Sequence, residues 1–181
     1  MKKQQAIIGG AERAFEAEGF RGIGVDKILA QSGASTRTLY KHFGSRDGLV
    51  VEVLKQRHLA FMALLREADP SDPVGQLFDI QRRWTDDHIN SGCMFLRAHG
   101  EYAAVNAEIT AVVHDHKQQF ETEIGRRVEI ALGSPDADLA MQISLLFEGA
   151  TALLSLRGPI TLETAKEAAA LLVRARLEHR P

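Results

Sequence analysis

Residues whose side chains can bind nucleic-acid phosphates and base edges are concentrated between positions 27 and 46. Arg37, Lys41 and Arg46 supply positive charge there, and this stretch contains no Asp or Glu, although the chain as a whole has a formal net charge of −2. An arginine can bind a guanine edge through two parallel hydrogen bonds, and lysines and hydroxyl groups bind phosphate oxygens. These residue types therefore indicate DNA recognition.

The spacing around these residues predicts two short helices joined by a turn. In residues 27–43, KILAQSGASTRTLYKHF, we expect the first helix to end near Ser32 and the second to begin after Ser35. Gly33 can adopt the positive φ that ends a helix, and the Ser35 hydroxyl can cap the next one. Leu39 and Phe43 lie four residues apart and face the core, so the polar side chains of the second helix face outward.

The expected DNA contacts divide into two kinds. Arg37, near the start of the second helix, is the candidate for a bidentate contact with guanine, while Tyr40, Lys41, His42 and Arg46 are assigned to phosphates. Two alternatives stay open: Tyr40 can pack at the helix edge, and His42 can cap the helix C-terminus. The predicted DNA-binding residues are Ser35, Thr36, Arg37, Thr38, Tyr40, Lys41, His42 and Arg46.

The segment GIGVDKILAQSGASTRTLYKHFGSRDGLV resembles the DNA-binding signature of the TetR/AcrR family of bacterial regulators, over about residues 5–55. The TLYKHF core and the Ser-Arg-Asp-Gly-Leu start of the next helix carry the resemblance. Three positions differ from the usual family pattern, namely Leu29, Ala34 and Arg46. Arg46 keeps the usual positive charge and Ala34 an apolar turn, whereas Leu29 requires local repacking.

The charge distribution agrees with a DNA-binding N-terminal part. Residues 1–57 carry ten Lys/Arg against six Asp/Glu, and the remainder carries twelve against eighteen. A basic end that meets nucleic acid and an acidic end that does not is the natural interpretation. We expect a DNA-binding domain at residues 1–46 and a regulatory and dimerisation domain at residues 47–181.

Helical periodicity continues through the rest of the chain and predicts an all-α fold of nine helices. Prolines should break the chain at 68–73, and a loop is expected at 90–92. Ser134 and Pro135 indicate one helix start, and Thr161 is the expected cap of the last helix. The predicted helices cover residues 4–18, 25–32, 35–43, 45–67, 74–89, 93–107, 109–132, 134–157 and 161 onward.

The eighth predicted helix is apolar on several faces, more than one small domain can cover, and the ninth carries a stripe of small residues. The resemblance likewise implies a homodimer through helices 8 and 9. It also implies a small-molecule effector bound within helices 4 to 8, although aromatic residues at this spacing also form ordinary core. The candidate lining residues are Phe61, Leu65, Phe78, Trp84, His88, Phe95, Tyr102, Phe120 and Phe147.

A second resemblance lies in SGCMFLRAHGEYA, which is similar to a GC-x-F-x-x-A-x-x-E-Y pattern in the bodies of some family members. Its Cys93 is the only cysteine, so we interpret it as core filler in preference to a redox switch. His114 and His116 point to different helix faces, and we expect no metal site there.

No catalytic motif, cofactor-binding motif, secretory signal or run of 18 apolar residues is present in the sequence. We therefore expect a non-enzymatic, cytoplasmic protein without a cofactor or a membrane partner. The leading hypothesis is a dimeric, ligand-responsive repressor that binds a palindromic DNA operator. The alternative is a DNA- or partner-binding protein of the same fold without a small-molecule switch.

Overall fold

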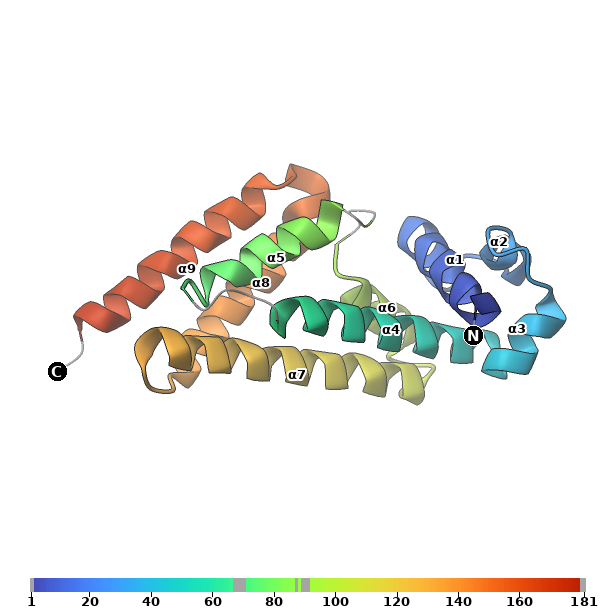
Figure 1. Ribbon diagram of the computed structural model, residues 1–181, viewed down its shortest axis with the longest axis horizontal. Helices are drawn as coiled ribbons and strands as arrows, with labels where there is room; N and C mark the ends of the chain where they lie inside the picture. The colour runs from blue at the N-terminus through green and yellow to red at the C-terminus, as the bar shows by residue number, and fades with distance from the viewer. Residues whose placement is uncertain (1, 67–70, 87, 89–91, 180–181) are drawn as a thin grey trace. The chain divides into compact units, whose positions relative to one another are not determined.

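The computed structural model describes residues 2–66, 71–86, 88 and 92–179, and within them it contains nine α-helices and no strand (Figure 1). The predicted all-α fold is therefore confirmed. The parts of the predicted 68–73 break and 90–92 loop that fall at 68–70 and 90–91 lie outside the described residues. The chain forms two compact units, each of which contains two separate segments of the sequence.

Unit 1 comprises residues Met1–Ala60 and Met94–Asp115. It contains α1 (Lys2–Glu18), α2 (Val25–Leu29), α3 (Thr36–Phe43), most of α4 (Arg46–Arg66), α6 (Met94–Tyr102) and the start of α7 (Ala107–Leu132). Phe15, Phe20 and Tyr102 pack in its core, where the ring centroids of Phe15 and Phe20 are 5.0 Å apart and those of Phe20 and Tyr102 are 6.1 Å apart. Two segments far apart in the sequence thus form one core.

The ends of α2, α3 and α4 show how local sequence builds the N-terminal part of unit 1. The α2 helix ends at Leu29, earlier than expected, because the amides of Ala30 and Ser32 bond to carbonyls three residues back and continue the chain as turns. Gly33 then adopts the expected positive φ of 57°. Ser45 caps α4 by accepting a hydrogen bond from the amide of Gly48 at 2.8 Å.

Unit 2 comprises residues Phe61–Cys93 and His116–Pro181. It contains the end of α4, α5 (Gly75–Asp86), the larger part of α7, α8 (Ala137–Arg157) and α9 (Ile160–Glu178), with α9 packed beside α8 and α5 (Figure 1). Arg127 is fully buried there and donates hydrogen bonds to the carbonyls of Leu65 and Pro73. These bonds satisfy carbonyl groups at the end of α4 and before α5.

Several predicted helix limits were wrong, for local reasons. The α8 helix was expected to start at Ser134 and Pro135, but it begins at Ala137. Asp136 caps it by accepting a hydrogen bond from the amide of Leu139 at 2.8 Å. Thr161 lies inside α9 and donates to the carbonyls of Ala150 and Gly158 instead of capping the helix. The α6 helix is also shorter than expected and ends at Tyr102. The predicted end of the fifth helix, at 87–89, includes positions 87 and 89, which lie outside the described residues.

By length and composition alone, α8 is the one described helix that could cross a membrane, with a mean hydropathy of 1.5 over its most apolar window. Its residues Leu139, Ile143 and Leu154 are buried in the core of unit 2. Only a third of the window is buried, however. The remaining apolar surface of α8 is open to solvent in a single chain.

Candidate nucleic-acid interface

The α3 helix is built to present a polar face on a fixed apolar base. Ser35 caps it by accepting a hydrogen bond from the amide of Thr38 at 3.2 Å, as predicted. Leu39 is fully buried and Phe43 is 9% exposed, so the helix is anchored along one side. Gly44 ends it with a φ of 71°. The expected helix-turn-helix of α2 and α3 is therefore present.

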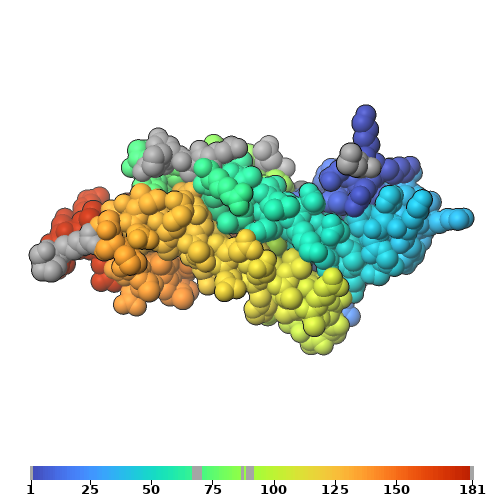
Figure 2. Space-filling view, turned by 60° about the horizontal axis from the view of Figure 1, so that its bottom comes forward, coloured from blue at the N-terminus to red at the C-terminus, as the bar shows by residue number. Residues whose placement is uncertain are grey.

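Most of the predicted DNA-binding residues lie on the exposed side of α3. Figure 2 shows the light-blue segment that contains α3 open at the surface of unit 1. Tyr40 is 47% exposed, so it does not pack into the core. Thr38 is half-buried, and its hydroxyl lies 2.9 Å from that of Ser35. The exposed members of the predicted set are Ser35, Thr36, Arg37, Tyr40, Lys41 and His42.

Arg37 and Lys41 make no hydrogen bond or ion pair within the described part of the chain. They lie four residues apart and so project from neighbouring positions on the helix. Lys27, on the preceding helix, is by contrast paired with Glu18 at 2.5 Å. Arg37 and Lys41 are therefore available to bind an anion, and α3 itself carries no acidic residue.

Arg46, a predicted phosphate contact, makes several hydrogen bonds inside unit 1. Its guanidinium donates to the carbonyls of Phe20 and Ile23 and, at 3.0 Å, to the hydroxyl of Tyr102. Only 22% of its side chain is exposed. Because these donors are directed at groups inside unit 1, Arg46 holds the turn between α1 and α2.

Tyr102 links this arginine to the start of α7. Burial raises the pKa of Tyr102 above its ordinary value, and the neighbouring Arg46 only partly opposes this effect. The protonated phenol is 3.4 Å from a carboxylate oxygen of Asp47, to which it donates, and Asn106 donates to the other oxygen at 2.8 Å. Asn106 also caps α7 through the amide of Ile109. Tyr102, one of the predicted effector-binding residues, thus lies within the hydrogen-bonded framework of unit 1.

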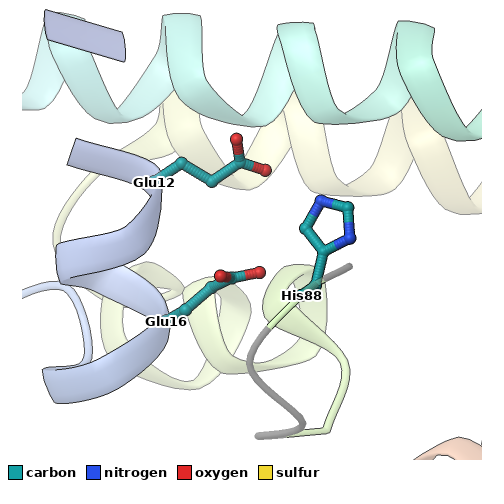
Figure 3. Close-up of side chains that lie close together, drawn as sticks. All are labelled: Glu12, Glu16 and His88. Carbon is teal, nitrogen blue, oxygen red and sulfur yellow. The ribbon is translucent and has the colours of Figure 1, made fainter. Parts of the chain in front are cut away.

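Three charged residues that sequence reasoning did not select join α1 to α4. Glu12 and Glu16 extend from one side of α1 (Figure 3), and Arg57 on α4 donates to both, at 2.7 and 2.6 Å. Arg57 and Glu16 are 8% and 3% exposed. His88, drawn in the same view, belongs to unit 2. The helical spacing of Glu12 and Glu16 was the available signal, but nothing local indicated their partner.

Most of the predicted effector-binding residues gather in the core of unit 2. Phe61 lies within ring-contact distance of Trp84, Phe120 and Phe147, with centroid separations of 5.4, 5.7 and 6.5 Å. Phe78 contacts Phe147 as well, and His88 stacks on Trp84 with centroids 4.0 Å apart. Leu65 belongs to the same core, whereas Phe95 and Tyr102 are buried in unit 1.

Cys93 is half-buried and contacts a charged pair in unit 2. Lys117 lies 3.5 Å from its sulfur and donates to Glu148 at 2.5 Å. Burial lowers the pKa of Lys117, but Cys93 and Glu148 outweigh that effect and leave it above its ordinary value. Cys93, which we interpreted as filler in preference to a redox switch, thus has an ammonium group as a neighbour.

Comparison with known proteins agrees with this geometry. Residues 7–53 match the family described as bacterial regulatory proteins, tetR family. Over 54 residues the chain is 33% identical to the HTH-type transcriptional regulator LmrA of Bacillus subtilis, and this match spans 29% of the chain and 29% of that relative. The matched region contains all of α2 and α3.

Solved structures extend the likeness to the whole chain. A TetR-family transcriptional regulator from Streptomyces coelicolor is 26% identical, with a TM-score of 0.84 over 98% of this chain and 97% of that one. A second, from Streptomyces avermitilis, is 25% identical with a TM-score of 0.72 over 94% and 99%. Together with the helix-turn-helix, these findings show that residues 7–53 match the tetR family of bacterial regulatory proteins and that the whole chain has the fold of TetR-family transcriptional regulators.

Proposed function

We propose that the protein is a homodimeric repressor that binds a palindromic operator through α3 and releases it when a small molecule binds. The observation that carries the DNA-binding part is the exposed face of α3, where Arg37 and Lys41 have no partner within the described residues. Unpaired cations beside hydroxyl groups can contact phosphates and base edges without first breaking internal bonds.

The contacts with DNA are assigned by position on α3. Ser35, Thr36, Arg37 and Thr38 form the N-terminal end of the helix, the end that enters the major groove in helix-turn-helix proteins. Arg37 would read a guanine there, and Lys41, Tyr40 and His42 would bind phosphates. His42 retains the second role considered above, because it lies in the last turn of α3, where a positive charge favours the helix dipole.

The apolar surface of α8 and α9 supports the homodimer. Leu145 and Leu156 are 66% and 77% exposed on α8, and Leu171 on α9 is 60% exposed. A shallow groove between the two helices is lined by further apolar residues, including Leu153 and Ile160. Exposed apolar surface of this kind is typical of an interface. A symmetric dimer would present two copies of α3 to the two halves of a palindrome.

The aromatic core of unit 2 is the region that we assign to the effector. Phe61, Phe120 and Phe147 supply apolar contacts, and Trp84 with the stacked His88 supplies polar groups beside them. Binding sites for small molecules combine these two kinds of surface. An effector releases DNA only if it binds the DNA-incompetent state more tightly than the competent one. DNA binding supports action in the cytoplasm.

Selection of duplexes from a random pool by the purified protein, followed by affinity measurements at several salt concentrations, tests the DNA-binding proposal. We expect a palindromic sequence, two subunits per site and an affinity that falls steeply with salt. A monomer in solution, or no salt-dependent affinity for any duplex, would overturn it. A thermal-shift screen of metabolites tests the effector, because a ligand at a hundred times its Kd stabilises the protein by about 2.7 kcal/mol.

A further inference from the structure

The turn between α1 and α2 closes around a carboxylate that comes from α6. Glu101 accepts hydrogen bonds from the amide of Phe20 at 3.1 Å and from the amide of Arg21 at 2.7 Å. Gly19, just before them, has a φ of 80°, and a Cβ placed there would lie 3.0 Å from a Glu101 oxygen. Successive amides that converge after a residue of positive φ form an anion-binding concavity. Here a side chain of the same protein fills it.

The carbonyl groups of the same turn are held from the other side. Arg46, at the start of α4, donates to the carbonyls of Phe20 and Ile23. Its other terminal nitrogen donates to the hydroxyl of Tyr102, the neighbour of Glu101 on α6. Glu101 on α6 therefore binds two amides of the turn, those of Phe20 and Arg21. Arg46 on α4 binds two of its carbonyls, those of Phe20 and Ile23. These bonds involve charged groups, which makes them stronger than bonds between neutral partners.

This turn leads directly into α2 and α3. Residues 19–24 separate α1 from α2, so the direction in which α2 and α3 leave α1 depends on the conformation of these few residues. The α6 helix follows immediately after Cys93, the last residue of one segment of unit 2, and α7 re-enters unit 2 at His116. Residues 94–115 thus supply to unit 1 both Glu101, which binds the amides of this turn, and Tyr102, which binds Arg46.

We propose that Glu101 is a positioning residue for DNA binding, which fixes the direction of α3 through the α1–α2 turn and so sets the half-site spacing that the dimer accepts. The inference rests on the proposed function. It also assigns a role to the Glu-Tyr end of the second sequence resemblance. Since hydrogen bonds weaken steeply with misalignment, a small displacement of α6 changes how this turn is held.

The test compares DNA duplexes that differ only in the spacing of their half-sites. The duplex selected by the wild-type protein is the reference, and one or two base pairs are added or removed at its centre, each of which moves the half-sites by about 3.4 Å. The Glu101→Gln variant keeps the shape of the side chain but removes its charge and replaces one acceptor oxygen with a donor. Glu108→Gln, at an exposed position of α7 in unit 1, is the matched control.

We expect Glu101→Gln to bind the reference duplex about tenfold more weakly, because it cannot form the charge-assisted hydrogen bonds of the carboxylate. Affinity for the altered spacings should fall less, so that the preference for the reference spacing decreases by at least about threefold. Preference for the bases inside each half-site should not change. Glu108→Gln should retain both preferences.

Two results would overturn the inference. One is an unchanged spacing preference in Glu101→Gln. The other is an equal loss of affinity for every duplex together with a lower melting temperature, which would give Glu101 a purely structural role. Glu101→Asp keeps the charge but shortens the side chain, so it should relax the spacing preference less than Glu101→Gln does. It serves as the test variant if Glu101→Gln does not fold. Failure of the wild-type protein to bind DNA would instead contradict the proposed function.

Discussion

Arg57 on α4 donates a hydrogen bond of 2.6 Å to Glu16 on α1, and both side chains are more than nine-tenths buried. Arg57→Met would leave the carboxylate of Glu16 buried without this partner. Uncompensated buried charges destabilise a protein strongly, and we expect the free energy of unfolding to fall by roughly 3–5 kcal/mol. Urea denaturation followed by circular dichroism measures the change.

An exposed ion pair provides the control for this substitution. Arg82 and Glu163 are 2.7 Å apart, with side chains that are 52% and 48% exposed. Arg82→Met should change the unfolding free energy by no more than about 1 kcal/mol, because solvent screens exposed pairs. Similar effects of the two substitutions would contradict the distinction between them.

Arg37 and Lys41 should give different DNA-binding phenotypes. Arg37→Ala is expected to relax the preference at one base pair of each half-site by roughly 1–3 kcal/mol. Lys41→Ala should weaken binding to all sequences alike and reduce the slope of the salt dependence by about one unit for each phosphate that is no longer bound. Competition binding with single-base variants of the selected duplex separates the two. If Arg37→Ala lowered affinity uniformly, its role as a base reader would be wrong.

Arg46→Lys tests whether Arg46 acts inside unit 1. A lysine keeps the positive charge but cannot reach the carbonyls of Phe20 and Ile23 and the Tyr102 hydroxyl at once, because it lacks the planar fork of the guanidinium. We expect a lower melting temperature with an unchanged salt dependence of DNA binding. A second variant, Arg46→Gln, removes the charge. If Arg46 bound a phosphate, this variant would keep its stability and show a smaller salt dependence of DNA binding.

Leu145→Glu tests the proposed dimer surface on α8. Leu145 is 66% exposed in the single chain, so a charge there should not disturb the fold of the protomer. Burying that charge in an α8–α9 interface would be costly, and we expect the dimer Kd to rise by at least about a hundredfold. Sedimentation velocity over a range of concentrations measures this. Leu59→Glu on α4, at a position 58% exposed, should remain dimeric.

Glu123 should contribute to stability in a pH-dependent way. Burial raises the pKa of Glu123, but hydrogen bonds from Arg126 and Arg127 outweigh this effect and hold the pKa below the ordinary value of 4.5. A carboxyl group with a lowered pKa in the folded protein stabilises it above the pKa of the unfolded chain, and this contribution is lost as the pH falls through the folded-state value.

Glu123→Gln should therefore lower stability at neutral pH and flatten the decline of the unfolding free energy below about pH 4.5. Urea titrations at pH values between 3 and 7 measure both effects. An acid decline as steep as that of the wild-type protein would show that other carboxyl groups account for it.

The sequence predicts those features of the fold that depend on neighbouring residues. Gly33 defines the turn because it adopts a positive φ. Ser35 defines the start of α3 because its hydroxyl caps the amide of Thr38, three residues further on. Where two local signals compete, the prediction is less accurate. Pro135 and Asp136 are both acceptable near a helix start, and only the hydrogen bond from Leu139 to Asp136 shows which position begins α8.

Contacts between distant parts of the chain explain what the sequence could not predict. Arg46 has the charge and position expected of a phosphate ligand, but its partners are 23, 26 and 56 residues away. Glu101 is separated from the amides that it binds by 80 and 81 residues. No periodicity or spacing motif encodes such pairs, because they arise only when α6 packs beside α1. The exposed side of α3, whose residues are adjacent in sequence, was open to prediction.

Unit 1 is made of two separate segments of the chain, and this limits how the DNA-binding part can be transferred between regulators. A chimera that joined residues 1–60 to another body would leave the amides of Phe20 and Arg21, and the guanidinium of Arg46, without the partners they have on α6. A functional graft must therefore carry residues 94–115 along with the N-terminal helices. Within one evolving chain, the same dependence ties changes in α6 to compensating changes around Gly19.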